Sequence, residues 1–179
     1  MPKNPKPAEL AILGLLYQKE QGSHGYDLAR HFSRGEPLGE VLHLEPGMLY
    51  HHLKRMEANG LVESVIEEQE SRPARQSYTL SEKGKQELRE WLNQPVSRTR
   101  DIRIDFLIKL YFARTIEPSI GKSLVEQQLE TCVRLAESLE LQIEDIASHP
   151  ESDDSAFLRS VLQLRLAQNE SAIRWLTSI

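Results

Sequence analysis

The sequence has a single cysteine, Cys132, in 179 residues, and it has no long apolar run. One thiol excludes a disulfide within the chain and a zinc site built from clustered cysteines, and it is typical of a reducing cytosol. No segment reaches the roughly 20 apolar residues of a membrane span, and residues 1–7 lack the apolar centre of a signal peptide. These absences predict a cytoplasmic protein with no membrane partner.

Positive charge is also scarce, because 22 Lys and Arg stand against 27 Asp and Glu and leave a net charge of −5. The chain as a whole therefore has no field that would draw it to nucleic acid or to an acidic membrane. Any contact with nucleic acid has to be made by a local surface.

The motifs of the common enzyme classes are missing from the sequence as well. It contains no phosphate-cradling glycine loop, no nucleophile elbow and no Cys/His or paired-carboxylate constellation at diagnostic spacing. We therefore expect a protein that is not an enzyme and that uses no cofactor. Five histidines in the first half leave a metal-responsive regulator as an alternative, although adjacent histidines on a helix point to different faces.

What the sequence does contain is a helix with both of its ends marked. Pro46 suits the first position of a helix, and Asn59-Gly60 supplies a left-handed stop. Apolar residues at a spacing of four and three predict one buried stripe on this helix. The stripe consists of Leu49, Leu53 and Met56.

The opposite face of this helix is typical of a helix that enters a DNA major groove. Gly47 offers bare backbone for a close approach, and the neighbouring side chains can reach base edges or phosphates. These side chains are Tyr50, His51 and Lys54. An ordinary surface helix fits the segment equally well when it is taken alone.

The residues before this helix predict a helix-turn-helix unit. Pro7 opens a helix that is apolar around nearly its whole circumference, and Ser23 can cap a second helix that runs to Phe32. A polar connection over residues 34–39 leads to the helix that begins at Pro46.

The residues after it predict a β-hairpin, or wing. Two β-prone runs, 61–67 and 76–80, are joined by a polar tip over residues 68–75. Arg72 and Arg75 in this tip could reach phosphates or the minor groove. Acidic residues close by leave a plain solvated loop as the alternative. A serine-capped helix over residues 81–92 then closes the first module.

The pattern is helical throughout beyond the linker at residues 95–100. An apolar helix begins at Ile102, and two long helices can fold back on each other with seams typical of a coiled coil. One small domain cannot cover these seams, so we expect the hairpin to pair with a second copy of the chain. The predicted dimer contacts are Leu129, Cys132, Leu139, Ile143, Leu162, Leu166 and Ile173. Asn169 either fixes the register of the seam or lies at its exposed boundary.

Taken together, these segments resemble the PadR family of bacterial transcriptional regulators. The resemblance is carried, in order along the chain, by residues 12–16, 24–28, 45–57, 60–62, 72–75 and 78–84. The C-terminal half resembles the long helical dimerisation domain of the subgroup related to virulence gene activators, and residues 105–110 match its characteristic start.

This resemblance implies a mainly α-helical fold with a small β-hairpin, divided into a winged helix-turn-helix domain over residues 1–94 and an antiparallel helical dimerisation domain over residues 95–179. It implies a homodimer that binds a palindromic operator, usually as a repressor. The implied DNA contacts are Pro46, Gly47, Tyr50, His51 and Lys54 on the recognition helix, with Arg72 and Arg75 at the wing tip. Ser71 departs from the family, which commonly has glycine there.

Two questions stay open at this level. The aromatic residues of the C-terminal half and the end of the first module either line a pocket for a small-molecule effector or only pack. They are Trp91, Tyr111, Phe112 and Trp175. A helical protein-interaction adaptor is the remaining alternative, although it would leave the recognition face without a purpose.

Overall fold

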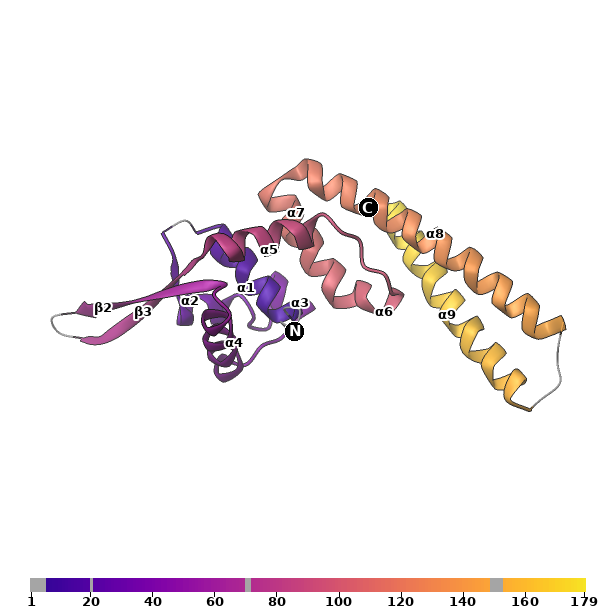
Figure 1. Cartoon of the computed structure of the whole chain (residues 1–179), viewed down its shortest axis with the longest axis horizontal. Helices are drawn as coiled ribbons and strands as arrows, with labels where there is room; N and C mark the ends of the chain where they lie inside the picture. The colour runs from indigo at the N-terminus through magenta and orange to yellow at the C-terminus, as the bar shows by residue number, and fades with distance from the viewer. Residues whose placement is uncertain (1–5, 20, 70–71, 149–152) are drawn as a thin grey trace.

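The computed structural model describes residues 6–19, 21–69, 72–148 and 153–179. Its elements run along one elongated molecule, with a β-hairpin projecting at one end and two long helices at the other (Figure 1). Helices dominate, and three strands form one antiparallel sheet. This confirms the fold class that the sequence predicts.

The N-terminal unit is built around α1 (Pro7–Tyr17). Every residue from Ala8 to Leu16 is buried, because apolar side chains surround the helix and Glu9 is the one charged residue among them. The elements packed against α1 include α4 (Pro46–Ala58), α5 (Glu82–Leu92), α7 (Leu107–Ile116) and β3 (Arg72–Leu80).

The sheet has the strand order β1-β3-β2. Its other strands are β1 (Ser23–His24) and β2 (Val62–Gln69). The wing is made by β2 and β3, which stay paired closer to the tip than the sequence predicts: Glu67 lies opposite Arg75, and Gln69 lies opposite Arg72. The expected tip over residues 68–75 was therefore too long, because backbone pairing continues past the stretch in which apolar and polar residues alternate.

Two short elements differ from the sequence prediction. Ser23 does not cap α2 (Gly25–Arg30), since His24 is the N-cap and Ser23 pairs with Tyr78 in β1. The connection predicted over residues 34–39 contains the start of a five-residue helix, α3 (Pro37–Val41), which Pro37 opens. Elements this short carry too few residues for a periodic pattern to show.

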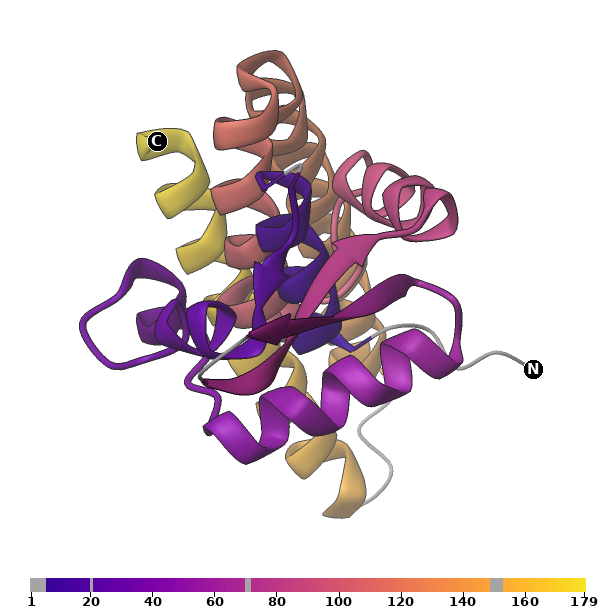
Figure 2. The same ribbon diagram turned by 90° about the vertical axis from the view of Figure 1, so that its left-hand side faces the viewer.

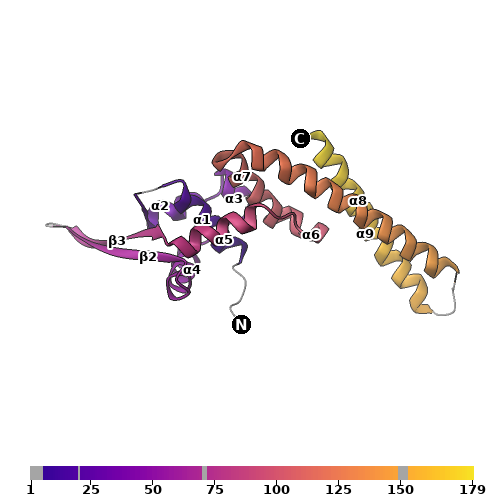
Figure 3. The same cartoon turned by 45° about the horizontal axis from the view of Figure 1, so that its top comes forward.

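The C-terminal half is helical, as predicted. Its remaining elements are α6 (Thr99–Asp101), the π-helical turn η1 (Ile102–Phe106), α8 (Pro118–Ser148) and α9 (Asp153–Ser178). The pair α8 and α9 forms the predicted hairpin, which stands clear of the N-terminal unit in two views (Figure 1, Figure 3). Within the described ranges, no helix is both long and apolar enough to cross a membrane.

The hydrophobic core continues across the predicted boundary between residues 94 and 95. Phe112 of α7 is fully buried against α1, where a Cβ on Gly14 would lie 2.6 Å from its ring. The absence of a side chain at Gly14 therefore lets α7 approach the central helix. The first part of the C-terminal half packs as part of the N-terminal unit, while α8 and α9 extend away from it.

The seam that was predicted to contact a second copy lies largely between α8 and α9 of one chain. Cys132, Leu139 and Leu162 are at most 4% exposed, so the chain's own hairpin covers them. The other predicted seam residues are half-buried: Leu129, Ile143, Leu166 and Ile173. A periodic stripe predicts that a face is covered, but it does not say by which chain.

Asn169 is fully buried in this seam, which excludes the exposed boundary position. Its Nδ2 donates a hydrogen bond of 2.6 Å to the backbone carbonyl of Cys132 on the facing helix. A buried amide needs such a partner, so this bond favours one register of α9 along α8.

We predict that Gly14→Val lowers the free energy of unfolding by about 1–3 kcal/mol, because the added methyl groups would force α7 away from α1. Thermal unfolding followed by circular dichroism measures the effect. The matched control is Gly47→Ala, since nothing lies within 4 Å of a Cβ at Gly47. An unchanged melting temperature for Gly14→Val would contradict this account of the contact.

Candidate nucleic-acid interface

Helix α4 has one fully buried face and one exposed face. Leu49, Leu53 and Met56 are 0% exposed, which confirms the stripe predicted from the sequence. The five residues of α4 that are predicted to meet DNA are exposed: Pro46, Gly47, Tyr50, His51 and Lys54. Viewed along the molecule from the wing end, α4 lies on an outer surface, beneath the strands (Figure 2). The structure thus presents these five residues to solvent on one helix.

Both ends of α4 are fixed locally, as the sequence predicts. Pro46 occupies the first turn, and Gly60 has a positive φ of 68° after the helix. The amide of Gly60 donates to the carbonyl of Glu57, and the amide of Leu61 donates to the carbonyl of Met56, both at 2.9 Å. This pair of bonds is a Schellman stop, which satisfies two carbonyls that the helix leaves without partners.

The orientation of α4 depends on a buried carboxylate that sequence reasoning missed. Glu9 of α1 is 2% exposed, and its Oε1 lies 3.1 Å from Nδ1 of His52 and in contact with the guanidinium of Arg55. Its Oε2 accepts a hydrogen bond of 3.1 Å from the backbone N–H of Lys6. A buried carboxylate requires partners of this kind, and two of them come from α4. An acid in the middle of an apolar helix was the signal available in the sequence.

Tyr50 links α4 to α2. A Cβ on Gly25 would lie 2.5 Å from Cε1 of Tyr50, so the ring covers the bare first turn of α2 while the side chain stays 48% exposed. A ring held in this way loses little further freedom when it meets a ligand. The same two helices also expose Tyr26 and Met48, which the sequence analysis did not single out.

The loop before α4 is held by His43. Its Nδ1 lies 3.1 Å from the carbonyl of Phe32, and its Nε2 lies 3.0 Å from Oε1 of Glu45. In the parts of the chain that the structure describes, no group of three or more His, Cys, Asp or Glu residues could hold a metal ion. The alternative of a metal-responsive regulator therefore gains no support from these residues.

The wing carries mixed charge in its described part. Arg75 is exposed and lies opposite Glu67, whose Oε2 is 3.9 Å from Nε2 of His24. The backbone of Arg72 lies in β3, but its side chain falls outside the described part, as do residues 70 and 71. Contact of Arg72 and Arg75 with DNA stays a prediction.

The four aromatic residues that could have lined a pocket are engaged in packing. The indole N–H of Trp91 donates to Asp105 at 3.1 Å, and the ammonium of Lys109 lies 5.0 Å from the centre of the Trp91 ring. The other rings meet edge to face, Phe106 with Trp175 and Tyr111 with Phe112.

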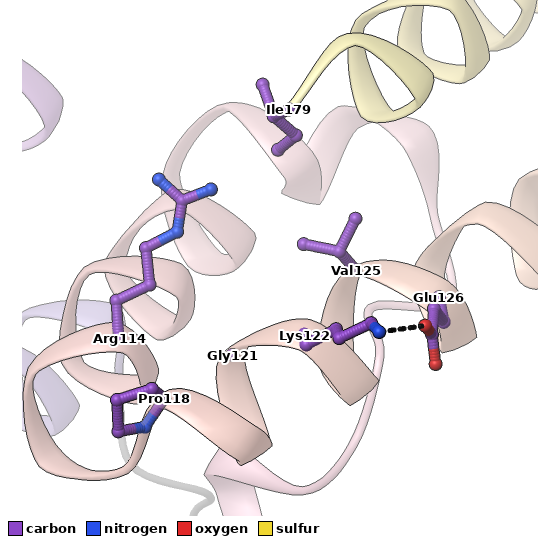
Figure 4. Close-up of a pocket in the computed structure, with 7 residues that line it drawn as sticks. All are labelled: Arg114, Pro118, Gly121, Lys122, Val125, Glu126 and Ile179. Atoms are coloured by element: carbon purple, nitrogen blue, oxygen red, sulfur yellow. Dashed lines mark ion pairs between the residues drawn. The ribbon is translucent and has the colours of Figure 1, made fainter.

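A cavity of about 380 Å³ lies elsewhere, between α7, α8 and the end of α9 (Figure 4). Its lining consists of Arg114, Pro118, Gly121, Lys122, Val125, Glu126 and Ile179. Lys122 and Glu126 form an ion pair across 4.0 Å within it.

We predict that Glu9→Gln lowers the free energy of unfolding by about 1–3 kcal/mol, because the amide keeps an acceptor for His52 but removes the charge beside Arg55. Urea denaturation measures this loss. Glu82→Gln is the matched control. Glu82 pairs with Lys85 on an exposed surface, so this substitution should leave the free energy of unfolding unchanged. If both variants unfold at the wild-type urea concentration, Glu9 is not the anchor that we describe.

Comparisons with known proteins find matches for both halves of the chain. Residues 12–90 match the Transcriptional regulator PadR-like family, and residues 102–179 match the family described as Virulence activator alpha C-term. The Negative transcriptional regulator PadR of Bacillus subtilis (strain 168) is 29% identical over 177 residues, which cover 94% of this chain and 93% of that protein. The Probable transcriptional regulator Rv1176c of Mycobacterium tuberculosis is 29% identical over 171 residues, which cover 89% of each chain.

Among solved structures, the crystal structure of Bacillus subtilis PadR in complex with operator DNA is 28% identical, covers 95% of both chains and gives a TM-score of 0.45. The structure of the same protein in complex with p-coumaric acid is 27% identical and gives a TM-score of 0.41. At these scores the whole-chain shapes agree only loosely, and the assignment rests on sequence. The first family match runs from α1 into α5 and the second from η1 to the end of α9, so the chain carries a domain of the PadR-like family of transcriptional regulators followed by a Virulence activator alpha C-term domain.

Proposed function

We propose that this regulator binds a palindromic DNA operator as a homodimer, with α4 of each copy in the major groove, and that it represses transcription in the cytoplasm. The observation that carries the proposal is the two-faced helix α4, which buries one stripe completely and exposes backbone, rings and a cation on the other side. The Bacillus subtilis relative is a negative transcriptional regulator, which supports repression.

The exposed residues of α4 suit a DNA groove chemically. Gly47 has open space around it, which permits a base edge or phosphate to approach the backbone closely. His51 and Tyr50 can donate to and accept from base edges, while Lys54 supplies a charge for a phosphate. Recognition helices contact bases mainly through residues near their N-termini, which is where Gly47, Tyr50 and His51 lie.

The charge distribution is compatible with this assignment despite the negative total. The acidic residues that flank the recognition surface have hydrogen-bond partners within the chain. Glu45 contacts His43, and Glu57 accepts a hydrogen bond from the hydroxyl of Ser64. Helix α8, at the other end of the molecule, exposes a series of acidic residues that lie away from α4. They are Glu126, Glu130, Glu137, Glu140 and Glu144. Such an arrangement disfavours non-specific binding more than specific binding.

We predict that His51→Ala lowers affinity for DNA about tenfold, as loss of one base contact would. Lys54→Ala should weaken binding to all duplexes and reduce the salt dependence by about one unit of slope. Fluorescence anisotropy on the duplex that the wild-type chain enriches from a random pool measures both effects. Arg134→Ala, which removes an exposed cation from α8, is the matched control. Wild-type affinity in both α4 variants, with unchanged helicity, would place the DNA surface elsewhere.

Dimerisation is supported by apolar residues that the single chain leaves exposed on its long hairpin. Leu141 on α8 and Phe157 and Leu164 on α9 are between 60% and 74% exposed. Large exposed apolar side chains on a hairpin that projects from the body are typical of a protein interface. A second copy would cover them, together with the half-buried seam residues Leu129, Ile143, Leu166 and Ile173.

We predict that the double substitution Phe157→Glu and Leu164→Glu yields monomers, because two buried charges cannot be solvated in the interface. Sedimentation equilibrium should give the single-chain mass of 20.5 kDa for this variant and twice that mass for the wild type. Gln163→Glu, a charge added at an exposed position of the same helix, controls for charge alone. A stable dimer of the double variant would mean that another surface pairs the two copies.

An effector site completes the proposal. The cavity in Figure 4 combines apolar lining from Val125 and Ile179 with a cation, and this combination suits a small carboxylate with an apolar body. Because Lys122 is paired with Glu126, Arg114 is the cation that we assign to such a ligand. The p-coumaric acid bound by the Bacillus relative is a molecule of this class.

A further inference from the structure

The segment between α5 and α6, where the N-terminal unit meets the long hairpin, is held at three points. Three of the few buried polar side chains in the described chain reach it: Lys109 of α7, Gln128 of α8 and Asn169 of α9. They are 3%, 1% and 0% exposed. Their contacts fall on Gln94, Val96 and Thr99, in or directly before the linker predicted over residues 95–100.

Gln128 holds Val96 with two hydrogen bonds. The backbone N–H of Val96 donates to Oε1 at 2.7 Å, and Nε2 donates to the carbonyl of Val96 at 3.0 Å. The backbone N–H and C=O of Val96 are thus both hydrogen-bonded to the Gln128 side chain, as they would be to a neighbouring β-strand. Val96 itself is 5% exposed, so its backbone has little access to water that could replace these bonds.

Asn169 and Lys109 act on either side of Val96. The hydroxyl of Thr99 donates to Oδ1 of Asn169 at 3.0 Å, while the amide of Asn169 bonds to Cys132 on α8. The ammonium of Lys109 donates to the carbonyl of Gln94 at 2.5 Å and lies over the ring of Trp91. One chain segment is therefore bonded to α7, α8 and α9 within six residues.

A flexible tether would not need this arrangement. A buried polar side chain costs stability unless it is hydrogen-bonded, and apolar side chains would fill the same space without that requirement. The hydrogen bonds fix the orientation of the segment relative to each helix, because each bond requires a particular distance and angle. Because α7 packs as part of the N-terminal unit, the bonds of Gln128 and Asn169 resist movement of this unit relative to the hairpin, and the bond of Lys109 holds the segment itself in place.

We propose that Lys109, Gln128 and Asn169 are positioning residues that fix the separation of the two DNA-binding units, so that the dimer selects operators by the spacing of their half-sites. The proposal rests on the proposed function, since it requires a dimer that binds DNA through α4. A rigid connection holds two recognition helices at one separation and one relative rotation. Each inserted base pair turns a half-site by roughly a tenth of a duplex turn, which a rigid dimer cannot follow.

The test uses Gln128→Met, which keeps the length of the side chain but removes both hydrogen bonds to Val96. Gln127→Met is the matched control, because Gln127 is adjacent on α8 and its amide donates to Ser123 of the same helix. Thr99→Val, which removes only the bond to Asn169, is a second variant should Gln128→Met fail to fold.

The first readout is the distance between spin labels at the exposed positions Arg34 and Glu137, measured by pulsed electron paramagnetic resonance. Labels are attached through unnatural amino acids, which leaves the buried Cys132 untouched, and labelled chains are diluted with unlabelled ones. We expect a narrow distribution for the wild type and Gln127→Met, and a broader one for Gln128→Met and Thr99→Val. A distance distribution as narrow as that of the wild type in both Gln128→Met and Thr99→Val would overturn the proposal.

The second readout is the ratio of affinities for the selected operator and for the same operator lengthened by two base pairs between its half-sites. We expect Gln128→Met to reduce this ratio about fivefold or more, with less change in affinity for the selected operator. An unchanged ratio despite a broadened distance would also overturn the proposal. If the wild type enriches no duplex at all, the proposed function fails, and the distance measurement alone then decides whether these residues hold the connection.

Discussion

The buried carboxylate of Glu9 joins the central helix to the helix that we assign to DNA. It sits among apolar side chains, where an unpaired charge would be strongly unfavourable, and it is paired with His52 and Arg55 of α4. These partners lie three residues apart, so they come from the same side of α4 and orient it about its own axis. The face that carries Gly47, His51 and Lys54 is consequently turned outward.

Apolar and polar contacts contribute differently to this fold. The apolar core supplies stability, since α1 is covered on all sides and Phe112 packs directly on Gly14. Hydrophobic contact has no preferred direction, however, and buried polar groups set the angles between the parts. Glu9 does so for α4, and Gln128 and Asn169 do so for the connection to the hairpin. In our proposal, the contacts of Glu9 and those of Gln128 and Asn169 are all needed to present two recognition helices at one separation.

The sequence predicts best those features that are decided within a few residues. The ends of α4, its buried stripe and the Ser81 cap of α5 all follow from local geometry, and the structure confirms them. It predicts less well what depends on a distant partner. The contacts of Glu9 and of Gln128 join residues 43 and 32 positions apart, and β1 exists only because β3 lies beside it. Likewise, the helical period marks the α8 seam without showing that α9 of the same chain covers it.

Photo-crosslinking would show most directly whether α4 reads the bases. A photo-reactive amino acid in place of His51, bound to the enriched duplex and irradiated, marks the bases that it touches. We expect crosslinks in the major groove at two symmetry-related positions, one duplex turn or a multiple of it apart. The same amino acid at Lys122 serves as the reference. Crosslinks from position 122 without any from position 51 would mean that α4 does not read the bases.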